Sequence, residues 1–85
     1  MSVTATLDIV VRALAVQAGV AESSVDPGKP LSAVPGIESV KALRAITEIE
    51  DECDVVIPDD FLFESATVRE LADFVAELAR KGSTI

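Results

Sequence analysis

The chain has no histidine, tryptophan or tyrosine, and it has only one cysteine. Without histidine, the Ser-His and Cys-His pairs that activate nucleophiles in many enzymes cannot form. A single cysteine excludes an intramolecular disulfide and a cysteine-based zinc site, which suits a cytoplasmic protein. We therefore expect a cytoplasmic protein that is not an enzyme and that holds no metal.

Basic residues are also scarce, with 7 Lys and Arg against 15 Asp and Glu and a net charge of −8. Affinity for nucleic acid and for anionic membranes comes mainly from basic residues, so we expect neither as a partner. Asp8 and Arg12 interrupt the apolar N-terminal stretch and no basic region precedes it, which predicts neither a signal peptide nor a membrane span. The charge favours a monomer whose partners are soluble proteins with basic docking surfaces.

Apolar residues are plentiful, at 49% of the 85 residues, which is ample for one globular domain spanning residues 1–85. They recur with helical spacing from about Thr4 to Ala18 and from about Ser39 to Asp54. A third helix should begin at Thr67, where Thr67 and Glu70 match a capping box. Residues 59–64 can form one short helical turn, which brings Phe61 or Phe63 onto the core.

These elements predict an all-α fold, a small four-helix bundle of three longer helices and one short helix. Gly19 is expected to end the first helix. The long first loop that follows is rich in proline and glycine, and a loop of this length needs anchors. We expect Leu31, Val34 and Ile37 to pin it across the ends of the helices.

The second helix has one apolar side and one polar side when its residues are placed about 100° apart. Val40 falls on the polar side, among charged residues, and is the one apolar exception there. The predicted core side consists of Ala42, Leu43, Ile46, Ile49 and Cys53. On that side Cys53 is expected to be a buried small hydrophobic residue.

The start of this helix carries the most informative residues. Pro35 and Gly36 allow a tight turn, and Glu38 and Ser39 then supply side-chain oxygens that can cap orphan N–H groups. The simplest interpretation of Ser39 is an N-cap. A hydroxyl at this place also lies where the helix dipole and backbone donors receive a phosphate.

The segment Gly36-Ile37-Glu38-Ser39-Val40 resembles the Gly-x-Asp-Ser-Leu motif of acyl and peptidyl carrier proteins. The resemblance continues in order through residues 48–52, 56–58 and 67–72. It implies that a phosphopantetheinyl transferase esterifies Ser39 with phosphopantetheine. The arm would then carry an acyl, aminoacyl or peptidyl group as a thioester between a loading enzyme and a downstream synthase or transferase.

The resemblance also implies a pathway of fatty-acid, polyketide or nonribosomal peptide type, and it makes the second helix the main recognition element. The residues expected to dock partners are Glu38, Val40, Lys41, Arg44, Thr47 and Glu48. Lys41 and Arg44 differ from the acidic residues that many fatty-acid carriers have in this region. Their charge leaves the choice of partner open.

Two other hypotheses follow from the same residues. Glu38 stands where the family usually has Asp, so the chain could be an unmodified helical interaction module that keeps the carrier fold. The acidic residues between Glu48 and Glu64 could suggest a calcium site, but the ligand spacing and glycine of an EF-hand loop are missing. We interpret these acidic residues as a solvated surface that faces partners.

Overall fold

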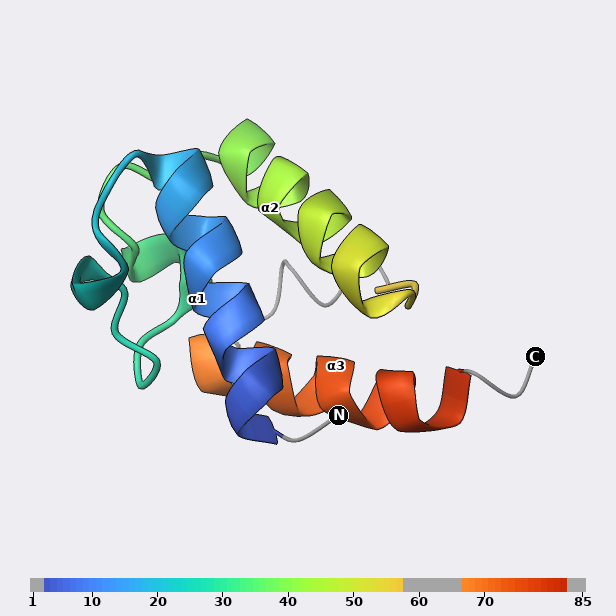
Figure 1. Cartoon of the computed structure of the whole chain (residues 1–85). Coiled ribbons are helices and arrows are strands. Elements are labelled where there is room, and N and C mark those ends of the chain that lie inside the picture. The colour runs from blue at the N-terminus through green and yellow to red at the C-terminus, as the bar shows by residue number, and fades with distance from the viewer. Residues whose placement is uncertain (1–2, 58–66, 83–85) are drawn as a thin grey trace.

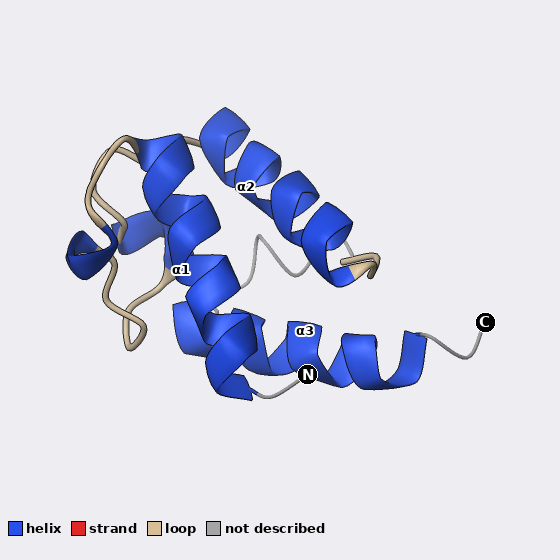
Figure 2. Cartoon of the chain, in the orientation of Figure 1, coloured by secondary structure: helices blue, strands red, loops and turns tan. Residues whose placement is uncertain are grey.

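The computed structural model describes residues 3–57 and 67–82. Three α-helices make up most of these residues: α1 (Val3–Ala18), α2 (Ser39–Cys53) and α3 (Val68–Gly82). Helix α1 packs against both of the others, and α1 and α2 run side by side in opposite directions (Figure 1). The rest of the described chain consists of two short 3₁₀ helices and loops, without a strand (Figure 2), so the all-α prediction is confirmed. The short helix expected at residues 59–64, with Phe61 and Phe63, lies outside the described residues.

Glycine ends the first helix, as the sequence predicts. Gly19 has a left-handed φ of +73°, which an L side chain rarely adopts. Its N–H donates to the carbonyl of Val16 at 3.3 Å, and the Val20 N–H donates to the carbonyl of Ala15 at 3.0 Å. This pair of bonds is a Schellman motif, which satisfies carbonyls that the helix itself leaves unpaired.

All three helices contribute to one hydrophobic core. Because α1 lies between the other two, it is buried over much of its girth, as predicted, although Val16 is 62% exposed on its outer side. Each helix places two of its largest apolar side chains at 5% exposure or less: Val10 and Leu14, Ile46 and Ile49, Leu71 and Val75.

The predicted core side of α2 is wrong at Leu43 and lacks Ala45, and its Ala42 is only half-buried. Leu43 is 45% exposed, whereas Ala45, which the apolar pattern did not include, is fully buried. Ile46, Ile49 and Cys53 are buried as expected. The buried arc is centred near Ile49, and Leu43 lies about 120° away from that residue around the helix. Helix α2 therefore presents the small Ala45 to the core and leaves the larger Leu43 at the edge.

The long loop between α1 and α2 contains two 3₁₀ turns, Glu22–Ser24 and Leu31–Ala33. The predicted anchors are confirmed, since Leu31 and Val34 are buried and Ile37 is partly buried against the core. The loop also caps α3 from a distance of about 40 residues along the sequence. The Val68 N–H donates to the carbonyl of Lys29 at 3.0 Å, and the N–H of residue 69 donates to the carbonyl of residue 27 at 2.9 Å.

The predicted capping box at the start of α3 is confirmed. The Thr67 N–H donates to Glu70 Oε1 at 2.9 Å, and the Glu70 N–H donates to Thr67 Oγ1 at 3.1 Å. At the C-terminal end of the helix, Arg80 and Lys81 form ion pairs with Glu77. The helix dipole favours cations at this end. Hydrogen bonds from these two cations hold the pKa of the Glu77 carboxyl below its ordinary value.

The chain leaves α2 through a tight turn. Asp54 takes a left-handed conformation with φ of +55°, and the Val55 N–H donates to the carbonyl of Glu50 at 3.2 Å. The Glu50 side chain then accepts the Ile57 N–H at 2.7 Å, and this bond holds the link beside the helix. Among the described helices, none is long and apolar enough to cross a membrane.

Candidate functional site

A tight turn sets the direction in which the chain enters α2. The Ile37 N–H donates to the carbonyl of Val34 at 3.2 Å, with Pro35 and Gly36 at the two central positions. Gly36 has φ of +80°. A type II turn typically has proline as its second residue and a glycine with positive φ as its third residue.

Gly36 is also pressed against the end of α1. A Cβ atom at this position would lie 2.8 Å from the carbonyl oxygen of Ala18, well inside van der Waals contact. Both the backbone conformation and the space therefore require glycine. The close approach holds the chain just before α2 against the C-terminal end of α1.

Ser39 does not cap α2, because the helix already includes it as its first residue. Glu38 is the N-cap, with an extended backbone (φ −122°, ψ 168°), and its carbonyl accepts the Ala42 N–H at 2.8 Å. Ser39 is the first helical residue, so its interpretation as the N-cap is wrong. The side chain of Glu38 makes no capping hydrogen bond either. The N–H groups of residues 39–41 consequently have no acceptor inside the helix, as at any helix start.

A lysine side chain folds back over this helix start. Lys41 Nζ lies 3.5 Å from Glu38 Oε1 and 3.4 Å from the carbonyl oxygen of Gly36. These two contacts place the ammonium group near the turn. Ser39 offers the oxygen that a phosphate ester needs, and the backbone N–H groups of the helix start and the Lys41 ammonium group are donors suited to the phosphate oxygens. The residues present at this helix start therefore fit a phosphopantetheine group.

The outer face of α2 is partly apolar. Val40 is 60% exposed and Leu43 is 45% exposed, and Thr47 continues the same stripe at helical spacing. Arg44 and Glu48 are also exposed and lie on the other side of Val40. Four of the residues expected to dock partners, Val40, Arg44, Thr47 and Glu48, therefore share one exposed side of α2. Leu43, which the sequence pattern placed in the core, joins them, and Glu38 is exposed at the N-cap. Only the sixth, Lys41, turns back toward Gly36 and Glu38.

Cys53 lies away from this face. It is buried at the end of α2, and burial followed by the neighbouring charge of Glu52 raises the pKa of its thiol. A raised pKa leaves little thiolate at neutral pH, which makes a thiol a poor nucleophile. The expectation that Cys53 acts as a small hydrophobic core residue agrees with this environment.

Comparison with known protein families gives a match that covers most of the chain. The family model described as "phosphopantetheine attachment site" matches residues 8–75, a span that includes four fifths of the chain. The matched span runs from the first half of α1 into α3 and contains the whole helix start described above. No curated protein and no solved structure matches the chain.

Proposed function

Because the chain belongs to the phosphopantetheine attachment-site family, we propose that it is a carrier protein with Ser39 as the residue that bears the arm. The observation that supports Ser39 is its place as the first residue of α2, directly after the turn fixed by Gly36. When bound, phosphopantetheine supplies a thiol that holds an acyl or aminoacyl group as a thioester.

The attachment step defines what the chain must offer. The Ser39 oxygen forms a bond to the phosphorus of coenzyme A nearest the pantetheine, the pyrophosphate bond breaks, and adenosine 3′,5′-bisphosphate leaves. The serine gives up its proton in this step. The chain has no histidine to receive that proton, and we assign the base to the transferase. The N–H groups at the start of α2 and the Lys41 ammonium group favour the phosphodiester that results.

The outer face of α2 is the proposed docking surface for the transferase and for the enzymes that load and use the cargo. Val40 and Leu43 contribute exposed apolar surface that a partner protein can bury. Arg44 and Glu48 give it charges of both signs, which select partners more than they strengthen binding. The chain itself would catalyse no step, because the thiol belongs to the arm and the chemistry to the partners.

The direct test is the intact mass of the full chain after incubation with coenzyme A, magnesium and a broad-specificity phosphopantetheinyl transferase. We expect a gain equal to one phosphopantetheine in the unaltered protein and none in Ser39→Ala. Ser32→Ala is the matched control, because Ser32 is an exposed serine in the neighbouring loop, and it should be modified fully.

An unmodified protein would contradict the proposal, provided that circular dichroism shows it to be helical. The chain would then be an interaction module with a carrier fold. Glu38→Asp is the variant that follows in that case. Modification gained by this change alone would assign the failure to the acidic position of the motif.

A further inference from the structure

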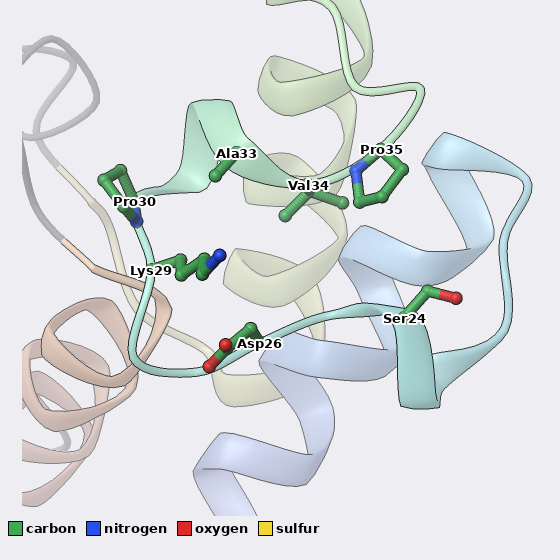
Figure 3. Close-up of a pocket in the computed structure, with 7 residues that line it drawn as sticks. All are labelled: Ser24, Asp26, Lys29, Pro30, Ala33, Val34 and Pro35. Atoms are coloured by element: carbon green, nitrogen blue, oxygen red, sulfur yellow. The ribbon is translucent and has the colours of Figure 1, made fainter.

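The loop between α1 and α2 forms a cavity of about 180 Å³ that is open to solvent, since all its lining residues except Val34 are exposed. Figure 3 shows that its walls come from two parts of the loop, the stretch around Asp26 and Lys29 and the turn that leads to Pro35. This cavity lies on the loop side of the molecule and shares only Val34 and Pro35 with the turn that leads into α2. Its size is several times the space of one water molecule, about 30 Å³.

The cavity is preformed, because hydrogen bonds and buried anchors fix both walls. Asp26 Oδ1 accepts the Gly28 N–H at 2.9 Å, and the carbonyl of Asp26 accepts the Lys29 N–H at 3.1 Å. The carbonyl of Lys29 is in turn bonded to the first turn of α3. On the opposite wall, Val34 is 5% exposed and is anchored in the core. Binding in such a cavity does not require the loop to be ordered first.

Its lining combines the Lys29 ammonium group, the Asp26 carboxylate, the Ser24 hydroxyl and apolar side chains. Lys29 extends its ammonium group into the space beside Val34, and Asp26 lies across from it (Figure 3). Within the described residues, the Lys29 ammonium group makes no ion pair or hydrogen bond. The remaining lining includes Pro30, Ala33, Val34 and Pro35.

This combination suits an amide rather than an ion. An amide carbonyl can accept from the Lys29 ammonium group while the amide N–H donates to the Asp26 carboxylate. A carboxylate ligand would be repelled by Asp26, and an ammonium ligand would be repelled by Lys29. Methyl and methylene groups on either side of the amide would contact the prolines and Val34. The pantetheine chain has two amides, a pair of methyl groups and short methylene links in one strand.

The cavity lies within reach of an arm on Ser39. Pro35 lines the cavity and is four residues before Ser39, so the two lie at most about 14 Å apart. The arm has fourteen chain atoms from phosphorus to sulfur and extends roughly 16 Å at the same rise per atom. A tethered ligand of matching length has an effective concentration in the millimolar range, which makes a weak site sufficient.

We infer that the cavity formed by Lys29, Asp26 and the apolar residues up to Pro35 is a resting site for the pantetheine part of the chain's own arm. This inference rests on the proposed attachment at Ser39. It goes beyond that proposal because it assigns the loop, rather than the helices, as the surface on which the arm lies between visits to partners. The cavity then favours a docked arm over one that moves freely.

The test is nuclear magnetic resonance of the full chain carrying the arm, with nuclear Overhauser effects measured from the arm's methyl and methylene protons. We expect contacts with the methyl groups of Ala33 and Val34. Ala33→Phe fills the cavity from an exposed position and should remove the contacts with Val34. Ser32→Phe adds the same ring one residue away, where the side chain does not line the cavity, and should keep them.

The mass of each sample separates the two proposals. A chain that gains the full mass at Ser39 but shows no contact with Ala33 or Val34 would overturn the resting site alone. Contacts that persist in Ala33→Phe would overturn it as well. A chain that gains no mass would overturn the attachment at Ser39 and the resting site together.

Discussion

Replacing Gly36 with alanine should be the most informative single change near the helix start. Two separate costs meet at this residue. Its φ of +80° is a left-handed conformation, which costs an L side chain about 1–2 kcal/mol. Its Cβ would lie 2.8 Å from the Ala18 carbonyl oxygen, and forcing extra atoms into such a contact costs about 1–3 kcal/mol. Together these two costs lower the unfolding free energy by about 2–5 kcal/mol. Alanine also restricts the unfolded chain more than glycine does, which offsets a small part of this loss.

Gly19 supplies a control that isolates the first cost. It has nearly the same φ, +73°, but a Cβ placed there has nothing within 4 Å. Gly19→Ala should therefore lose about 1–2 kcal/mol from the backbone alone. Urea unfolding followed by circular dichroism measures both losses on the full chain. In a domain of this size each kcal/mol lowers the melting temperature by about 4–8 °C, so thermal unfolding also separates the two variants.

Gly36→Ala should also slow modification by the transferase beyond what its lower stability explains, because the residue fixes how the chain enters α2. The measurement is the initial rate of mass gain at a temperature where both variants are folded. Equal losses of stability in Gly36→Ala and Gly19→Ala would refute the role of the Ala18 contact. An unchanged modification rate in Gly36→Ala would refute the link between the turn and the presentation of Ser39.

Three further predictions concern the ends of α2 and α3. Thr67→Ala removes one half of the capping box and should lower the unfolding free energy by about 1 kcal/mol, measured by urea unfolding; no loss would show that the box contributes nothing. Asp54→Gly relieves a left-handed residue and should raise the melting temperature, by an amount equivalent to about 0.5–1 kcal/mol; a lower melting temperature would contradict this. Burial and Glu52 raise the pKa of the Cys53 thiol, so the folded state holds that proton more tightly than the unfolded state. The stabilisation that the Cys53 thiol contributes should be fully present below the pKa of an unfolded thiol and should be lost as pH rises through the pKa of the folded state. If Cys53→Ala loses the same amount of stability at alkaline pH, the loss belongs to other groups.

The helix limits were predictable because local signals mark them. The first helix, expected from Thr4, begins at Val3, and the second, expected to reach Asp54, ends at Cys53. Glycine and the capping box satisfy backbone groups at the helix ends through residues only a few positions away. Such signals depend on adjacent residues, so the sequence alone contains them.

The side of α2 that faces the core was less predictable. Leu43 and Ala45 are both apolar, and periodicity favoured the larger residue, yet Leu43 is half exposed and Ala45 is fully buried. The choice depends on how closely α2 approaches α1, and a close approach favours a small side chain at the contact. No periodic pattern within one helix specifies that distance.

The bonds between the loop and α3 had no sequence signal at all. The carbonyls of Pro27 and Lys29 accept from the start of α3, and a backbone carbonyl is the same in every residue type. The position of Ser39 inside the helix rather than at its cap has a similar origin. It depends on the extended backbone of Glu38, which follows from the turn at Gly36 and not from the preferences of Glu38 or Ser39 themselves.

A carrier has to present its arm from a point that stays fixed while everything beyond that point moves. Under the proposed attachment at Ser39 this fixed point is the start of α2, and the residues just before it are held by contacts with the rest of the chain. Gly36 abuts the end of α1, Ile37 packs against the core, and the loop before them is bonded to α3. Each of the three helices therefore takes part in positioning the first residue of α2. It follows that substitutions at these supports should impair modification and cargo transfer together, whereas Ser39→Ala should abolish both and leave the fold intact.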